Sequence, residues 1–223
     1  MAVQERILQS WSGGKDSCMT LVEILRDGTR SVAALLTTVT EGYDRVSMHG
    51  VRHALLDRQA AALDLPLETV YIPQNATNEA YQARMEAVFE RYRQEGITTI
   101  AFGDLFLADI RRYREQWLAH AGMTPVFPLW MRDTRELARR FVDEGFEAVV
   151  TCVDTRVLDR GFAGRRFDHA LLADLPQAVD PCGENGEFHT FVHGGPIFRQ
   201  ALRVARGEIV QRESWCFCDL VPA

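Results

Sequence analysis

Lysine is almost absent from this sequence. Of the 25 basic residues, only Lys15 is a lysine and the rest are arginines. Arginine replaces lysine readily on a solvated surface, but its planar guanidinium is a poor substitute where a compact ammonium group must reach a ligand. The one position that carries a lysine is therefore the first candidate for a functional residue.

Several other signals are missing. The five cysteines contain no C-x-x-C pair, which argues for reduced thiols rather than a disulfide framework or a zinc site. No stretch has the ~18 apolar residues of a membrane span, and the N-terminus lacks a basic start followed by an apolar run. The net charge of −6 argues against nucleic-acid binding. These absences favour a cytoplasmic protein that does not bind membranes.

Strand and helix patterns alternate through the first two thirds of the 223 residues. Strands are predicted at 6–12, 31–39, 67–72, 98–102 and 148–153. Helices are predicted at 15–26, 50–64, 78–94, 108–121 and 134–144. This alternation indicates βαβ units and a mostly parallel sheet that is covered on both faces. We therefore expect an α/β fold with a doubly wound sheet.

The pattern changes after about residue 154. Helical periodicity fades, glycine, proline and polar residues become more frequent, and two late runs at 197–204 and 209–218 alternate like antiparallel strands. We expect a nucleotide-binding type of α/β domain at residues 1–150 and a smaller C-terminal α+β region at residues 151–223.

The S-G-G-K-D-S segment lies between the first strand and the first helix. Gly13 and Gly14 allow the backbone to approach a ligand closely, and the helix N-terminus that follows favours an anion. Ser12 and Ser17 can donate hydroxyl hydrogens to phosphate oxygens, and Lys15 adds a mobile positive charge. Neither G-x-x-x-x-G-K-[ST] nor G-x-G-x-x-G is present. The alternative is a turn whose glycines only close the connection.

This hexapeptide resembles the PP-loop of the ATP pyrophosphatase superfamily. The resemblance implies an adenine nucleotide alpha hydrolase-like sheet of order 3-2-1-4-5, ATP at the loop, and pyrophosphate release after a substrate oxygen is adenylated. In that order the first and fourth strands flank the ligand crevice. Gly103 and Asp104 follow the fourth strand, so Asp104 is expected to hold Mg²⁺ or orient the acceptor, unless the pair is only a turn.

The densest polar segment is G-E-N-G-E-F-H-T. It places Glu184 and Glu187 three residues apart in a glycine-containing loop, where carboxylates can bind ammonium, coordinate Mg²⁺ or act as a general base. A solvated acidic turn is the alternative.

Three weaker segments have a structural and a functional interpretation. The charges of Arg111, Arg114 and Glu115 lie within one helical turn of each other and most simply form a solvated face. Met48 and His49 either contact adenine or cap the next helix. For a P-L-W segment, packing is the simpler interpretation.

Taken together, the motifs resemble the diphthine–ammonia ligase family. The order S-G-G-K-D-S, M-H-G, N-E-x-Y, F-G-D, R-x-x-R-E, P-L-W, G-E-N-G-E-F-H-T and G-G-P-I-F extends from about residue 6 to beyond residue 198. The resemblance implies a ligase that uses ATP and Mg²⁺. Members of that family adenylate the carboxylate of diphthine on elongation factor 2, and ammonia then displaces AMP to give diphthamide; the resemblance implies the same reaction type here.

The resemblance also assigns roles to residues of this chain. The implied catalytic residues are Lys15, Asp104, Glu184 and Glu187. The implied ATP-binding residues are Ser12, Gly13, Gly14, Lys15, Asp16, Ser17, Thr38, Met48, His49 and Gly103. The substrate side is expected to contain Arg111, Arg114, Glu115, Asn185 and Thr190, and Mg²⁺ is expected at Asp16 or Asp104.

The short sequence resembles the bacterial branch of the family. Its 223 residues leave no room for a glutaminase domain, so free ammonia is the expected nitrogen source. Bacteria are not thought to make diphthamide, so the acceptor is diphthine only if the source makes that product, and otherwise another carboxylate. A homodimer is a further expectation. A PP-loop tRNA-modifying enzyme and a non-catalytic ATP/AMP sensor are the alternative functions.

Overall fold

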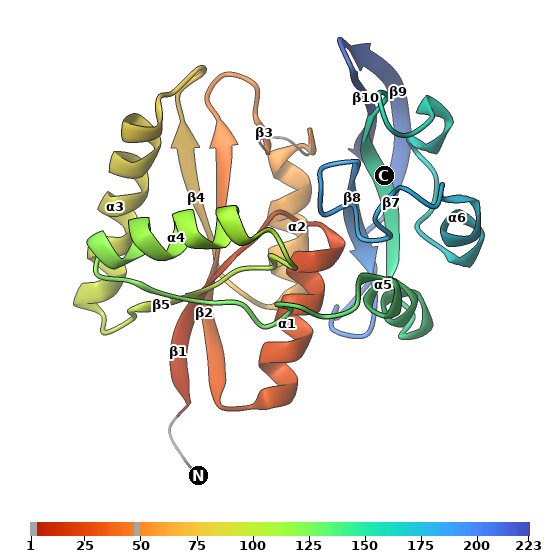
Figure 1. Cartoon of the computed structure of the whole chain (residues 1–223). Helices are drawn as coiled ribbons and strands as arrows, with labels where there is room; N and C mark the ends of the chain where they lie inside the picture. The colour runs from red at the N-terminus through yellow and green to blue at the C-terminus, as the bar shows by residue number, and fades with distance from the viewer. Residues whose placement is uncertain (1–3, 47–49) are drawn as a thin grey trace.

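The computed structural model describes residues 4–46 and 50–223, and these contain two β-sheets with helices between and around them (Figure 1). Sheet A consists of β1 (Glu5–Ser10), β2 (Arg30–Thr40), β3 (Arg45–Val46), β4 (Leu67–Ile72), β5 (Thr99–Ala101) and β6 (Thr124–Val126). Sheet B consists of β7 (Glu147–Asp154), β8 (Phe188–Gly194), β9 (Val204–Arg212) and β10 (Trp215–Pro222). The helices are α1 (Lys15–Asp27), α2 (His53–Leu63), α3 (Asn78–Gln94), α4 (Ala108–His120), α5 (Thr134–Asp143) and α6 (His169–Asp174), with a 3-10 turn at Arg160–Phe162.

Sheet A has the predicted doubly wound arrangement. Its strand order is β3-β2-β1-β5-β6, and β4 also pairs with β2. The parallel strands alone follow the order β4-β2-β1-β5-β6, which is the predicted 3-2-1-4-5. Because the order reverses between β1 and β5, the carboxyl ends of these strands open onto one crevice. The predicted fold class is confirmed.

One strand assignment was wrong. The fifth parallel strand is β6, whereas the predicted strand at residues 148–153 belongs to β7 in the antiparallel sheet B. Strand β6 spans three residues and contains Pro125, so it shows no strand pattern in the sequence. Strand β7 is a long apolar run, a pattern that parallel and buried antiparallel strands share.

The late strands also differ from the expectation. Residues 197–204 are mostly loop, and their alternation arises because Phe198 and Leu202 are each 9% exposed and pack on the core. Residues 209–218 contain the end of β9, a turn and the start of β10. The turn was not recognised because it lacks glycine and proline; Glu213 adopts its positive φ of 53° instead.

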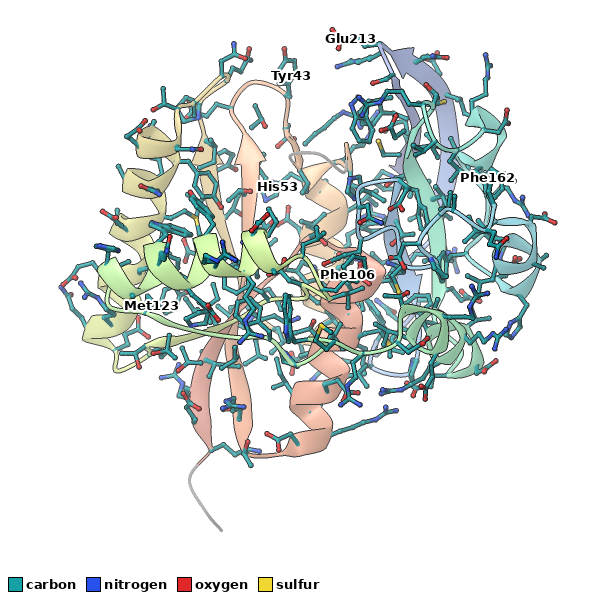
Figure 2. All side chains as sticks on the ribbon, viewed as in Figure 1. Tyr43, His53, Phe106, Met123, Phe162 and Glu213 are labelled. Carbon is teal, nitrogen blue, oxygen red and sulfur yellow. The ribbon has the colours of Figure 1, made fainter. Side chains whose placement is uncertain are left out.

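Two pairs of helices cover sheet A on opposite faces (Figure 1). Phe89 of α3 and Trp117 of α4 belong to the core on one face. Helices α1 and α2 lie between the two sheets, and Leu21 and Leu56 share a core with Phe191 of sheet B. Side chains fill this space (Figure 2). The shared core fixes sheet B against the helix that follows the glycine loop.

The helices largely follow the predicted ranges. Helix α3 has the predicted bounds, and α2 begins at His53, three residues later than expected. Within residues 4–46 and 50–223, no helix combines the length and the apolar character that crossing a membrane requires.

Candidate active site

The glycine loop joins β1 to α1. Gly13 has a φ of 78°, which favours glycine, and a Cβ at this position would lie 2.7 Å from Gln59 Oε1. Gly14 is the N-cap of α1 and provides no side-chain cap. Ser12 Oγ accepts a hydrogen bond from Gly14 N at 3.2 Å, and Ser17 Oγ lies 3.4 Å from Ser12 Oγ. The loop thus presents hydroxyl groups beside a helix N-terminus whose N-cap residue has no side chain, a suitable site for an anion.

Gln59 of α2 holds the loop in place. Its side chain is buried, and Nε2 donates to Gly13 O at 3.0 Å and to Val192 O at 2.5 Å. Its Oε1 accepts a hydrogen bond from Trp11 Nε1 at 3.0 Å. One amide group therefore connects the glycine loop to β8 of sheet B. Gln59 could not be recognised from the sequence, because a glutamine inside an Ala- and Leu-rich helix forms no motif.

Replacing Gln59 with alanine is expected to destabilise the protein by about 2–4 kcal/mol. The change removes three buried hydrogen bonds and leaves a small cavity beside Gly13. Urea denaturation followed by circular dichroism measures the loss. Gln74→Ala is the matched control, because Gln74 is exposed and donates one hydrogen bond, to Glu41 O. Equal stability of the two variants would contradict this role for Gln59.

The Lys15 side chain is enclosed by both halves of the molecule. It is 3% exposed, and its ammonium donates to Asp16 Oδ1 and Oδ2, each at 2.8 Å, and to the carbonyl oxygen of Cys182. The ring centroids of Phe167 and Phe188 lie 5.9 and 5.7 Å from Nζ. Burial lowers the pKa of Lys15, but the charge of Asp16, the hydrogen bond to Asp16 and the nearby Cys182 and Asp180 together more than offset this, so the net pKa is raised. Lys15 therefore keeps its positive charge at neutral pH.

Asp16 and Asp104 lie on opposite sides of one crevice. A Cβ on Gly103 would lie 3.1 Å from the Asp16 carbonyl group, so the chain after β5 touches the first turn of α1. Arg114 of α4 orients Asp104, with Nε 2.7 Å from Oδ2. Burial raises the pKa of Asp16, although the Lys15 ammonium opposes this shift. The two carboxylates therefore line the crevice from the segments that follow β1 and β5.

Glu184 reaches from the C-terminal region to the chain that follows β5. Its Oε1 accepts a hydrogen bond from Leu105 N at 2.7 Å, and its backbone N donates to Asp180 Oδ2 at 2.9 Å. Burial raises the pKa of Glu184 to about 7, against the hydrogen bond from Leu105, and the charges of Asp16 and Asp104 raise it further. A carboxyl group with this pKa can exchange protons at neutral pH.

Glu187 supports the loop from within. It is 6% exposed, and its Oε1 accepts hydrogen bonds from Asp180 N at 3.0 Å and from Asn185 Nδ2 at 2.9 Å. Neither Glu187 nor Asn185 lines the cavities described below. Both residues therefore form hydrogen bonds within the loop that carries Glu184 and do not line the site themselves.

Two adjoining cavities occupy the crevice. The first has a volume of about 270 Å³ and brings together the predicted residues Ser12, Gly14, Lys15, Asp16, Ser17, Gly103, Asp104, Arg114, Glu184 and Thr190. The second, of about 310 Å³, includes the predicted Thr38. The cavities share a wall formed by Ser10, Ser12, Phe102 and His189. Together they suit a small molecule that spans both. The predicted Met48 and His49 lie outside the described residues.

Arg111 and Glu115 line neither cavity. The Arg111 guanidinium lies 4.8 and 4.6 Å from the ring centroids of Phe127 and Trp130, and its Nε donates to Glu115 at 2.7 Å. The P-L-W tryptophan thus packs against an arginine, as the simpler interpretation of that motif expected.

Sequence reasoning missed His189 and most of the second cavity. His189 appears in the G-E-N-G-E-F-H-T motif, but it had no assigned role. The second cavity is lined by apolar and aromatic residues of several elements, among them Met85 and Trp117. Apart from the shared wall, its residues named in the sequence analysis are Thr38 and Tyr81, the tyrosine of N-E-x-Y. The other residues come together only through tertiary packing.

The oxygen donors of the first cavity fit Mg²⁺ bound together with phosphates. Mg²⁺ takes oxygen ligands, typically one or two carboxylates with the rest from phosphates and water. Asp16, Asp104 and Glu184 line this cavity, and their mutual repulsion favours a cation. Over the part of the chain that the structure describes, no group of three His, Cys, Asp or Glu residues could hold a metal on its own. This set therefore suits a metal that arrives with its phosphate ligand.

Replacing Glu184 with glutamine is expected to stabilise the free protein at pH 8 by about 1–2 kcal/mol, a value reduced for partial exposure. The pKa of Glu184 is raised to about 7. Its stabilising contribution is therefore complete below its unfolded pKa and is lost as the pH rises through about 7. Glutamine avoids this loss and can still accept the hydrogen bond from Leu105.

Urea denaturation at pH 4.5 and pH 8 tests this prediction. The two proteins should differ at pH 8 and converge at pH 4.5, and the exposed Glu86→Gln variant should match the wild type at both. A variant that is less stable at pH 8 would show that the ionised carboxylate is instead favoured in this site.

Comparison with known proteins places these features in one family of sequences. Models described as the diphthamide synthase N-terminal and C-terminal domains match residues 5–125 and 133–223. A diphthine–ammonia ligase of Schizosaccharomyces pombe is 25% identical over 96% of this chain, which spans 38% of that protein. Those of Homo sapiens and Bos taurus are 27% and 26% identical over 96% of this chain and 88% of each protein.

Proposed function

The chain belongs to the diphthamide synthase family, and from this premise we propose that it is an amide-forming ligase that adenylates a carboxylate and transfers it to ammonia. The comparisons confirm the predicted family and the enzyme class, an ATP-dependent ligase of the PP-loop superfamily. The acceptor and the roles of individual residues belong to the proposal.

One observation carries the proposal. The loop at residues 182–190 of the C-terminal region packs against the glycine loop at residues 12–17. Lys15 N donates to Thr190 Oγ1 at 3.1 Å, the Lys15 ammonium donates to Cys182 O, and Glu184 accepts a hydrogen bond from Leu105 N. A phosphate site and a carboxyl group with a pKa near neutrality therefore share one cavity. This combination suits nucleotide activation followed by a proton transfer.

The first step is attack of the acceptor carboxylate on the α-phosphorus of ATP. A carboxylate oxygen forms a bond to phosphorus, the bond to the β-bridging oxygen breaks, and pyrophosphate leaves with its electron pair. The α1 N-terminus and the Lys15 ammonium stabilise the charge that develops on the leaving group. Mg²⁺, held by Asp16 or Asp104 and the phosphates, would supply further neutralisation.

The second step forms the amide. Ammonia attacks the acyl carbonyl, the bond from carbon to the AMP oxygen breaks, and AMP leaves. The nitrogen must lose a proton, and Glu184 is the base in the cavity whose pKa matches this role. Free ammonia is the nitrogen source. The acceptor is diphthine on elongation factor 2 if the source of the chain makes diphthamide, and another carboxylate otherwise.

The function is tested by product analysis. The purified chain is incubated with ATP, Mg²⁺ and ¹⁵N-ammonium, together with diphthine-bearing elongation factor 2 or with a panel of small carboxylates. We expect one AMP and one pyrophosphate for each ¹⁵N-amide, and carboxylate-dependent exchange of labelled pyrophosphate into ATP. Sulfur or amine transfer to tRNA would indicate the modifying enzyme instead. Tight ATP binding with no pyrophosphate for any acceptor would favour the sensor.

A further inference from the structure

His189 lies where the two cavities of the site meet. It is one of four residues that line both, and the other three come from the chain around β1 and β5. The place where the cavities meet, the wall that they share, is called the neck here. His189 is the residue of sheet B that lines this neck. Nothing in its motif assigns it a function.

The chemistry of the two cavities is different. The first contains the N-terminus of α1 and the Lys15 ammonium, which suit the phosphates of ATP. The second is lined mainly by apolar and aromatic groups such as Leu36, Met85 and Trp117, with the hydroxyl of Thr38, and suits a base and a sugar. A nucleotide that spans both cavities has its α-phosphate at the neck, because that phosphate is attached to the sugar.

The His189 ring is held in a defined position. Strand β8 pairs His189 with Cys152 of β7, and the ring stacks on Trp215 of β10 with centroids 6.4 Å apart and planes inclined by 20°. Burial lowers the pKa of His189 to about 4, and the Lys15 ammonium lowers it further, against the effect of Glu187. The imidazole is therefore neutral at pH 7, and a neutral imidazole carries one N–H donor.

We propose that His189 contacts the α-phosphate and donates a hydrogen bond to one of its non-bridging oxygens during adenylation. The proposal rests on ATP occupying both cavities as in the proposed function. The imidazole keeps its proton throughout, while the acceptor oxygen bonds to phosphorus and pyrophosphate leaves. Its contribution is to stabilise charge on the α-phosphate oxygens in the transition state.

Binding of AMP and adenosine to the His189→Phe variant provides the first test. AMP has the α-phosphate and adenosine lacks it. Isothermal titration is expected to show AMP bound about 10-fold more weakly than by the wild type, with adenosine affinity unchanged. His193→Phe is the matched control, because His193 lies on the same strand, has Nδ1 3.6 Å from Glu147, and lines neither cavity. Unchanged AMP affinity, or an equal loss for adenosine, would overturn the proposal.

The rate of pyrophosphate exchange provides the second test. His189→Phe is expected to slow carboxylate-dependent exchange by about 10²-fold. His189→Gln, which keeps an N–H donor, should recover most of that loss. Equal losses in both variants, with unchanged melting temperatures, would overturn the proposal. If the wild type shows no exchange with any carboxylate, the proposed function fails, while the AMP and adenosine comparison still decides the role of His189.

Discussion

Replacing Lys15 with arginine is expected to lower the rate of pyrophosphate release from ATP by about 10²–10³-fold. The ammonium lies between the Asp16 carboxylate and the Cys182 carbonyl, with Phe167 and Phe188 closing the space around it. A planar guanidinium keeps the charge but needs more room and a different arrangement of acceptors. The positive charge would therefore lie away from the position in which it can stabilise the negative charge of the leaving pyrophosphate. Quenched-flow measurement of pyrophosphate gives the rate.

The reverse substitution at the surface is the control. Arg139 is exposed on α5 and lies outside both cavities, so Arg139→Lys should retain the wild-type rate. Melting temperatures separate a local defect from misfolding, and Lys15→Met, which removes the charge but keeps an unbranched side chain, should be at least as slow as Lys15→Arg. A Lys15→Arg enzyme with full activity would show that this site needs only a positive charge, and that the single lysine has no special role.

The sheet could be predicted because its signals are local. Strand β2 contains a buried apolar run, and in β4 the buried Val70 and Ile72 lie on either side of the exposed Tyr71. Strand β6 could not be recognised, because three residues around Pro125 gain strand geometry only by pairing with β5. The assignment of β7 failed for a related reason, since an apolar run does not indicate its partner.

The site was predictable where its chemistry is contiguous in the sequence. The S-G-G-K-D-S segment and Glu184 were found from their motifs, and the structure brings them together around one cavity. Gln59 and His189 could not be recognised, because their positions at the site depend on contacts between α2, the glycine loop and sheet B. Glu187 was predicted to be catalytic but lines neither cavity, since residue spacing does not show which way a loop carboxylate points. The homodimer and the division at residue 150 stay predictions.

Replacing Glu184 with glutamine is expected to slow amide formation by about 10²–10⁴-fold at pH 8, the range of general-base catalysis. Burial raises the pKa of Glu184 to about 7, so the wild-type carboxyl group is protonated and inactive as a base below that pH. It becomes competent as the pH rises through about 7. The ratio of wild-type to variant rates should therefore increase between pH 6 and pH 8 and then level off. The concentration of unprotonated ammonia also rises with pH, but it is the same for both enzymes and therefore cancels in the ratio of their rates.

The two half-reactions locate the defect. Adenylation does not require this base, so Glu184→Gln should still exchange pyrophosphate into ATP and accumulate acyl-adenylate in a burst. Glu86→Gln, on the exposed face of α3, should behave as the wild type in both steps. Parallel loss of exchange and amide formation would instead place Glu184 in acceptor or metal binding. The variant is also expected to be more stable at pH 8, so slower chemistry in a more stable protein would show that the buried carboxyl group is kept for its proton transfer.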